Sequence, residues 1–600
     1  MGGDLVEKNS RVLEERQRIA VDAVRIELDK DSVFQVIPES AANPSLKGSS
    51  AIWRTKINVS GKDREVDIGL SKLFPDDPPR AYVNDWEELF LRNPHVMKGG
   101  FLCTIPSSAA IDSSDPVGLF RHVYEQAQAI LVGVSTDDFK EEFSYYWNKC
   151  TKEGAQSVLI INPIENLGGS FPVVFKKGYV CIASSVERLN EWIKNLTGKQ
   201  PGLTEKSPGI LISLPAPLLP QDYPATLKDL LSLSETADNA AAEMIKDHIV
   251  NSHEKGLVLL SQKEGEGVAY GGIIFEGLEL CQSRSVELTH GFRQGRVPRG
   301  LLLERASNII NATVIIRSRV VRADHKWIHS RGGDGQDLSQ RSVLLIGCGS
   351  LGGYVAHLLA RAGVGKLTLI DNDLLGWENV GRNILGASSV DLPKAGALAE
   401  KLKQELPHLT IEGVIEDWRN VFDSEPGLFL KNDLIISTTA DWRCEKSLNF
   451  LAKKTQMPPI LLGWLEPYAV AGHCLLISRN GGCFECGANE FGQFQDNVAN
   501  FRTKTISKEP GGCAYYQHYG PTSLMPVASM ISSVAIESLI NTPSDSFLHT
   551  WISNEKHFRL VEAEIADGWK QLIGNGGYSR IFEKVWAKSN ACSLCNLSVS

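Results

Sequence analysis

The chain has 600 residues, 42% of them apolar, and a formal net charge of −9. This length predicts three to five domains, and the apolar content is enough for several packed cores. The acidic balance argues against a nucleic-acid partner, because a nucleic-acid binder needs a basic face. No window approaches 18 uninterrupted apolar residues, so we expect no membrane partner.

The twelve cysteines lie in a chain that begins without a secretion signal. The start, Met1–Lys8, has no apolar signal region and lacks the Ser or Thr that a myristoylation signal places at position 6. Reduced thiols and metal ligands are therefore expected rather than a disulfide framework. We predict a cytoplasmic protein.

The first block, residues 1–152, is predicted to be an α+β domain. Helical and alternating apolar patterns predict one helix, two strands and two further helices. The last of these helices carries an aromatic stripe, which we interpret as core packing. The predicted elements are a helix near 12–26, strands Ser50–Val59 and Glu65–Leu70, and helices Pro116–Val132 and Asp137–Trp147, with Phe139, Phe143 and Tyr146 in the stripe.

Cys103 stands ten residues after Asn93 and eight after His95, and the proline-rich stretch Phe74–Arg80 precedes them. A lone cysteine in an apolar sequence is usually a buried small hydrophobe. This arrangement, however, resembles ubiquitin-conjugating enzymes, which carry a "YP…PP" hairpin, then "HPN", then the thioester cysteine. The resemblance makes Cys103 the acyl-carrying thiol. Asn and His are exchanged, so both Asn93 and His95 are candidates to assist the reaction.

The middle block, residues 153–320, alternates short apolar runs with polar helical stretches, which predicts a mixed α/β domain. No catalytic constellation is found in it, and we expect a linker or docking domain. Its cysteines and Cys150 are interpreted as buried thiols. The expected strands are Ser157–Asn162, Pro172–Phe175, Gly256–Ser261 and Gly271–Phe275, and the expected connector is Leu214–Pro220.

The third block, residues 321–600, opens with a Rossmann-like pattern. A buried strand, Ser342–Ile346, is followed by a glycine turn and a helix, Tyr354–Arg361. Such glycines allow a tight turn and let phosphate approach the backbone amides at the helix N-terminus. The turn glycines are Gly347, Gly349 and Gly352.

The next strand, Lys366–Ile370, ends on Asp371, a carboxylate placed to hold ribose hydroxyls. Up to this point the pattern fits a dinucleotide dehydrogenase equally well. A triphosphate with magnesium also needs cations and a further carboxylate, which NAD does not. The candidates to supply these groups are Asp373, Arg382, Lys394 and Asp441, and the amide of Asn379 lies among them in the sequence.

Together these residues resemble the "DxD…SNLxRQ…K…TDN" run of the ThiF/MoeB adenylating family, which includes ubiquitin-activating enzymes. The resemblance implies ATP and Mg²⁺ as cofactors. By it, Asp371 holds ribose, Arg382 and Lys394 hold the phosphates, and Asp441 holds the magnesium. The run departs from the family at two positions, where Glu378 replaces Ser and Asn383 replaces Gln or His.

Two Cys-x-x-Cys pairs lie far apart near the C-terminus, and four thiolates make a closed tetrahedral Zn²⁺ site. A redox role is the alternative, but neither pair opens a helix after a strand in the thioredoxin manner. The adenylating family has the same split pairs. The four residues are Cys483, Cys486, Cys592 and Cys595.

Cys513 lies between the two pairs in a Gly/Pro-rich stretch that is not expected to be packed core. Activating enzymes place their thioester cysteine on such a loop after the first zinc pair. The alternative is an incidental loop thiol. Cys348, Cys444 and Cys474 are poorer candidates, because they lie in the glycine loop or in apolar runs.

In domain order the whole chain resembles the bacterial conjugating–activating fusion ligases of CBASS antiphage operons. The resemblance implies a relay in which a protein C-terminus is adenylated and passed from Cys513 to Cys103. It also implies a homodimer, a cGAS/DncV-like nucleotidyltransferase as the protein substrate, and an acceptor protein or small nucleophile.

Three alternatives stay open at this point. A sulfur-carrier adenylyltransferase of the ThiF type keeps the nucleotide and zinc residues but leaves the first 320 residues without a role. A dehydrogenase binds NAD instead of ATP. A non-enzymatic adaptor uses the N-terminal domain only to bind proteins, and the position of Cys103 argues against it.

Overall fold

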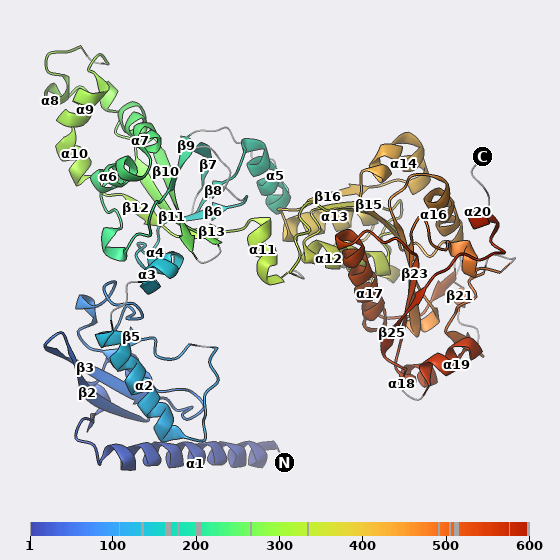
Figure 1. The fold of residues 1–600 in the computed structure, drawn as a ribbon, viewed down its shortest axis with the longest axis horizontal. Helices are drawn as coiled ribbons and strands as arrows, with labels where there is room; N and C mark the ends of the chain where they lie inside the picture. The colour runs from blue at the N-terminus through green and yellow to red at the C-terminus, as the bar shows by residue number, and fades with distance from the viewer. Residues whose placement is uncertain are drawn as a thin grey trace. The chain divides into compact units, whose positions relative to one another are not determined.

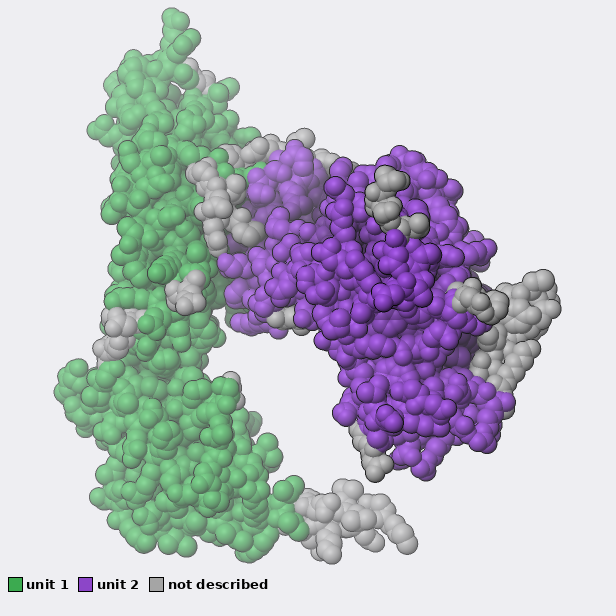
Figure 2. Space-filling view, turned by 45° about the vertical axis from the view of Figure 1, so that its right-hand side comes forward, with its two compact units in different colours: residues 1–158, 167–180, 206–321 green, residues 159–166, 181–205, 322–600 purple. Residues whose placement is uncertain are grey.

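The structure, a computed structural model, divides into two compact units, which are coloured separately in Figure 2. The first comprises residues 1–158, 167–180 and 206–321, and the second 159–166, 181–205 and 322–600. The division into three blocks stays a prediction. The described residues are 2–106, 108–133, 137–162, 170–176, 179–199, 207–264, 267–293, 295–332, 335–489, 493–502, 506–508, 515–574 and 577–596.

The N-terminal part of the first unit is an α+β domain, as predicted. Its five antiparallel strands pair in sequence order, and helix α2 packs against β2 and β4 (Figure 1). Alternate residues of β3, among them Val66 and Ile68, are fully buried beneath α2. The elements are α1 (Gly2–Leu28), β1 (Gln35–Val36), β2 (Ala51–Val59), β3 (Lys62–Leu70), β4 (Arg80–Val83), β5 (Phe101–Leu102) and α2 (Pro116–Val132).

The predicted helix Asp137–Trp147 is wrong as a single element. Two helices, α3 (Asp137–Glu141) and α4 (Phe143–Lys149), meet at Glu142, whose φ of −117° leaves the helical region. The break lets Trp147 enter the core of the middle sheet, where its indole donates to the Ser318 carbonyl at 3.0 Å. The stripe residues are buried, as expected.

The middle sheet has eight strands in the order β12-β11-β10-β9-β7-β8-β6-β13. All four predicted strands are present with shifted ends, and the expected α/β character is confirmed. Its strands are β6 (Ser157–Ile160), β7 (Ser170–Lys176), β8 (Tyr179–Ile182), β9 (Ser207–Ser213), β10 (Lys255–Glu264), β11 (Gly267–Glu276), β12 (Ile316–Ser318) and β13 (Val320–Arg322). The helices along this stretch are α5 (Val186–Thr197), α6 (Leu227–Ala237), α7 (Asn239–Asn251), α8 (Val286–Thr289), α9 (Arg299–Arg305) and α10 (Ser307–Ala312).

The second unit contains the Rossmann-like sheet, with order β16-β15-β14-β17-β18-β19-β23-β25. The strands from β16 to β18 are parallel and the rest antiparallel. The strands are β14 (Ser342–Ile346), β15 (Lys366–Ile370), β16 (Thr410–Val414), β17 (Leu434–Ser437), β18 (Ile460–Leu465), β19 (Ala471–Ile477), β23 (Phe547–Ile552) and β25 (Arg580–Val585). Two small sheets join β20 (Ala499–Phe501) to β24 (Ala563–Ile565) and β21 (Ile506–Lys508) to β22 (Tyr515–Gln517).

Helices cover this sheet, and the longest of them, α17, packs against α12 and β19. Of the described helices, α17 is the one long and apolar enough to cross a membrane, but 56% of its apolar window is buried in the protein. Core helices often have this composition. The helices are α11 (His325–Gly332), α12 (Ser350–Ala362), α13 (Lys394–Glu405), α14 (Trp418–Ser424), α15 (Pro426–Leu430), α16 (Trp442–Lys454), α17 (Pro521–Ile540), α18 (Glu555–Leu560), α19 (Asp567–Ile573) and α20 (Ser593–Asn596).

Candidate functional site

Cys103 follows strand β5, and a tight hairpin brings it opposite His95. The Met97 amide donates to the Phe101 carbonyl at 2.8 Å, and beyond that turn the Cys103 amide donates to the His95 carbonyl at 3.0 Å. Gly100 in the turn has a φ of 88°, and a Cβ there would lie 2.2 Å from a carbonyl of β4. Only glycine fits this position. The eight-residue spacing of His95 and Cys103 is therefore the length of one hairpin.

The His95 side chain contacts both the Cys103 thiol and Asp138 of α3. Its Nε2 lies 3.2 Å from Oδ2 of Asp138. A hydrogen bond with the Cys103 side chain raises the pKa of His95, burial opposes this, and the carboxylates of Glu142 and Asp138 raise it further. The His95 amide also donates to the Tyr146 hydroxyl at 3.0 Å. A thiol, an imidazole and an orienting carboxylate are thus in place for acyl transfer.

Asn93, the other candidate, has a different environment. Its side chain is buried, and Nδ2 donates to the carbonyl of Leu131 at 3.3 Å in the last turn of α2. This bond joins the Asn-Pro-His segment to the helix. Of the two residues considered for assistance at Cys103, the structure brings His95 to the thiol.

In the second unit, a pocket of about 710 Å³ lies at the carboxyl ends of β14, β15 and β17. Gly347 has a φ of 91°, and a Cβ on Gly352 would lie 1.9 Å from its carbonyl, so both positions need glycine. Gly349 precedes α12 with open space around it. The pocket has the position at which parallel α/β sheets bind nucleotides. Its walls include Gly347, Gly349, Asp371, Asp373, Asn379, Arg382, Lys394 and Asp441.

Asp371 lies at the end of β15 and shares its oxygens between two backbone amides. It accepts from Cys348 at 2.6 Å and from Asp373 at 2.8 Å. Burial raises the pKa of Asp371, although these hydrogen bonds lower it. The carboxylate is thereby fixed beside the glycine loop, where a ribose hydroxyl would need an acceptor.

Two cationic side chains, Lys394 and Arg382, line the same pocket. Lys394 Nζ lies 2.9 Å from Asp373 Oδ2, and only 12% of the Lys394 side chain is exposed. Arg382 lies over the Tyr519 ring at 5.2 Å and donates to the Gln517 carbonyl at 3.1 Å. Two oriented cations in one cleft suit a phosphate chain.

The side chains of Asp441 and Asn379, which line the pocket, accept hydrogen bonds from nearby backbone amides. Asp441 caps α16 by accepting from the Arg443 amide at 2.9 Å. Burial alone would raise the pKa of Asp441, but hydrogen bonds from the Arg443 amide and guanidinium hold it below its usual value. An ionised carboxylate is what a magnesium ion requires. The Asn379 side chain accepts from the Gly376 amide at 3.4 Å.

The three cysteines that were judged poorer candidates for the thioester thiol are all buried in the second unit. Burial raises the pKa of Cys348 and of Cys474, and it raises the pKa of Cys444 to about 12. Thiols of this kind are weak nucleophiles at neutral pH. Cys513 lies outside the described residues.

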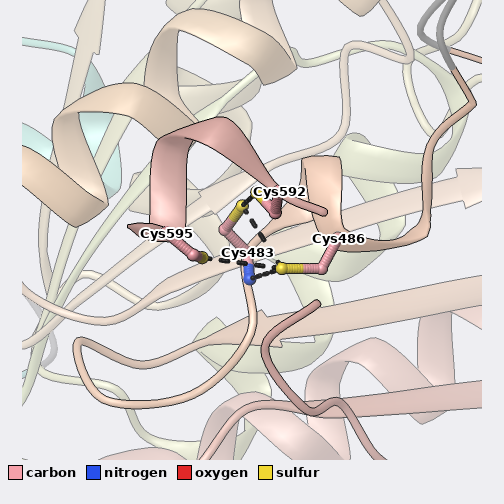
Figure 3. Close-up of side chains that lie close together, drawn as sticks. All are labelled: Cys483, Cys486, Cys592 and Cys595. Atoms are coloured by element: carbon pink, nitrogen blue, oxygen red, sulfur yellow. Dashed lines mark hydrogen bonds between the residues drawn. The ribbon is translucent and has the colours of Figure 1, made fainter. Parts of the chain in front are cut away.

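The two Cys-x-x-Cys pairs converge (Figure 3). Cys483 precedes the 3₁₀ turn Phe484–Gly487 and Cys486 lies within it, while Cys592 precedes α20 and Cys595 lies within it. Sγ of Cys483 lies 3.5 Å from that of Cys592, and Sγ of Cys486 lies 3.5 Å from Cys595 and 3.8 Å from Cys483. Tetrahedral zinc with Zn–S bonds of about 2.3 Å separates its sulfurs by about 3.8 Å. These distances fit zinc and exceed a disulfide bond of about 2.05 Å.

Sequence reasoning missed several groups at both sites. Asp138, Tyr146 and Tyr519 contact the predicted residues from other elements. The aromatic stripe gave the one available signal, because a tyrosine in a core usually directs its hydroxyl to a polar partner.

Both the region around Cys103 and the region around the nucleotide pocket match known protein families. Residues 325–567 match the ThiF family, and residues 45–155 match prokaryotic E2 family B. The chain is 27% identical to the ATP-dependent ubiquitin transferase-like protein Cap2 of Pseudomonas aeruginosa, over 72% of this chain and 77% of that protein. It is 25% identical to the Vibrio cholerae protein of that name, over 77% and 83% of the two chains.

This chain is a ubiquitin-like activating and conjugating enzyme. Its ThiF domain implies ATP as the nucleotide. The molybdopterin-synthase adenylyltransferase of Escherichia coli is 31% identical over 27% of this chain and 64% of its own length. Crystal structures of E. coli MccB align over 43% of this chain and 68% of theirs, with 14% identity and a TM-score of 0.30.

Proposed function

We propose that the enzyme activates the C-terminus of a protein and conjugates it through two thioesters. A carboxylate oxygen attacks the α-phosphorus of ATP and pyrophosphate leaves, which gives an acyl-adenylate. The Cys513 thiolate attacks the acyl carbon and AMP leaves. The Cys103 thiolate then displaces Cys513, and an acceptor amine displaces Cys103, losing its proton as the amide forms.

The observation that carries this proposal is the pairing of Cys103 with His95 across one hairpin, with Asp138 at 3.2 Å from the His95 imidazole. A neutral imidazole accepts a proton from a thiol or an attacking amine. A domain that only bound other proteins would not need these three groups together. We assign His95 as general base and Asp138 as its positioning residue.

The finer identity of the substrates rests on the resemblance to the CBASS ligases. We propose a cGAS/DncV-like nucleotidyltransferase as the activated protein, a cellular protein or small nucleophile as acceptor, and a cytoplasmic homodimer as the working form. The residues of the middle block would serve as the docking domain.

We further propose that Asp441 holds Mg²⁺ and that the four-cysteine cluster holds one Zn²⁺. The ionised Asp441 carboxylate and the sulfur distances support these assignments. Zinc would tie α20 to the 3₁₀ turn that carries Cys486. Cys592→Ser should therefore lose this zinc and destabilise the second unit. Unchanged metal content and thermal stability would refute the assignment.

Incubation with ATP and a nucleotidyltransferase of this class, followed by a non-reducing gel, tests the function. We expect an ATP-dependent adduct on the enzyme that a thiol reagent removes, and then a thiol-resistant product. An adenylate without any thioester would instead indicate a sulfur-carrier adenylyltransferase. Reduction of NAD without ATP dependence would indicate a dehydrogenase.

A further inference from the structure

Three histidines of the second unit converge away from the nucleotide pocket and the cysteine cluster. His325 and His329 lie on α11, and His408 lies in the loop before β16. Each offers one ring nitrogen, and the three nitrogens lie within 4.8 Å of one another. We propose that His325, His329 and His408 bind a divalent transition-metal ion of the zinc type.

The two helical ligands have the spacing that metal sites on helices use. Residues four apart lie on the same face of a helix, one turn above the other. A pair of histidines at this spacing presents two imidazoles to one ion, as in the His-x-x-x-His pair of zinc proteases. Here the pair is His325-Lys-Trp-Ile-His329. Chain folding then supplies the third ligand, His408.

The distance between His329 and His408 already suits two ligands of one ion. Their Nε2 atoms are 2.9 Å apart. Metal–nitrogen bonds of about 2.0–2.1 Å give about 2.9 Å between ligands at a right angle and about 3.4 Å in a tetrahedron. A metal could therefore replace the single proton shared by these nitrogens with a shift of at most about half an ångström, estimated from the same bond lengths.

Two described carboxylates lie near the cluster, Asp324 and Asp337, and each is already hydrogen-bonded elsewhere, Asp337 to the Ser339 amide at 3.0 Å. Asp324 precedes the first ligand, but both its oxygens are bound by Arg322, at 2.7 Å and 2.9 Å. His329 is also buried. Neutral imidazoles with available lone pairs are the form that binds zinc, copper or nickel.

The C-terminal turn of α12 orients two of the ligands. Gly363 has a φ of 94°, and a Cβ there would lie 2.9 Å from the His329 ring. The ring therefore occupies space that any other residue would fill. The Gly363 carbonyl lies 2.8 Å from Nε2 of His325, and if Nε2 donates to it, Nδ1 carries the lone pair. Metal-bound histidines commonly make such an outer bond to a carbonyl.

Zinc content of the full-length protein, measured after equilibration with micromolar Zn²⁺ and removal of free metal, tests this site. We expect about two zinc ions per chain, because the four cysteines and the three histidines would each hold one ion. His329→Ala and His408→Asn should each retain about one, and Zn²⁺ should raise their melting temperature less than that of the wild type.

His357→Ala is the matched control, because His357 lies on α12 outside the cluster and contacts Glu405. It should keep the wild-type zinc content. Gly363→Ala should lower the affinity for the second ion, because its Cβ would displace the His329 ring. This variant tests the site without removing a ligand. The proposal is overturned if the histidine variants keep the zinc content of the wild type, or if the ion that they lose binds the wild type only at millimolar Zn²⁺.

Discussion

The Cys103 hairpin and the nucleotide pocket assemble their reactive groups in different ways. The hairpin joins His95 to Cys103 through a single turn of chain, so their contact depends on local backbone geometry. The pocket collects groups from the ends of three parallel strands, between Gly347 and Asp441. A change in the pocket should therefore stop every step that follows adenylation, whereas a change at the hairpin should stop only the last transfers.

The two regions also differ in what a raised pKa means. Contact with Cys103 raises the pKa of His95 and favours its charged form. Burial raises the pKa of Glu445, behind the pocket wall, to about 7 and favours its neutral form. Glu445 accepts hydrogen bonds from Ser437 and Thr439 at 3.0 Å each. The raised pKa of His95 therefore affects the transfer reaction, whereas the raised pKa of Glu445 affects the stability of the fold.

Asp441→Ala should have the largest effect. Without the carboxylate that would hold magnesium, ATP–pyrophosphate exchange should fall to background, and no thioester should form on any cysteine. The measurement is isotope exchange, with the exposed carboxylate variant Asp567→Ala as control. Normal exchange in Asp441→Ala would remove the pocket from the start of the pathway.

His95→Ala should confine its damage to the hairpin. We expect adenylation to persist and transfer from Cys103 to slow by roughly 10²–10⁴-fold, the usual contribution of a general base. Single-turnover discharge of the Cys103 thioester measures this, and the exposed His122→Ala serves as control. An equal loss of adenylation would contradict the separation of the two regions.

Glu445→Gln should change the pH dependence of stability. The folded-state pKa of about 7, against 4.5 when exposed, means that the neutral carboxyl stabilises the fold below about pH 4.5. This contribution is lost as pH rises to 7, and at about 1.36 kcal/mol per pKa unit it amounts to about 3 kcal/mol. Unfolding by denaturant between pH 4.5 and 7 should show this loss in the wild type and not in the variant. Parallel pH curves would refute the shift.

Asp138→Asn should have the smallest effect. The variant removes a carboxylate that raises the pKa of His95, so the pH–rate profile for transfer from Cys103 should move to lower pH. Because the imidazole is also less well oriented, the maximal rate should fall by roughly tenfold, less than loss of the whole base. Glu141→Gln, on the same helix, is the control. A reduced rate with an unmoved profile would leave Asp138 with a purely structural role.

The sequence predicted elements and sites whose signals are local. Strand Ser342–Ile346 and helix Pro116–Val132 have the predicted bounds, and the two cysteine pairs meet as expected. The break at Glu142 was not predictable from the local sequence. Trp147, in the helix after the break, packs into the core of a sheet whose strands lie far along the chain. Asp138 lies 43 residues from His95 in the sequence, so no local pattern could show their contact. The histidine pair of α11 was visible in the sequence, but its third member comes from tertiary folding.

The most direct test of the relay is conjugation by Cys103→Ala, followed on a non-reducing gel after addition of ATP and the substrate protein. The account predicts that the acyl group accumulates on Cys513 as a thiol-sensitive adduct and that no amide product forms. The matched Cys103→Lys variant should trap the acyl group as a stable amide, because an amine does not leave as a thiolate does. Wild-type conjugation by Cys103→Ala would contradict the account and leave the N-terminal domain as a binding module.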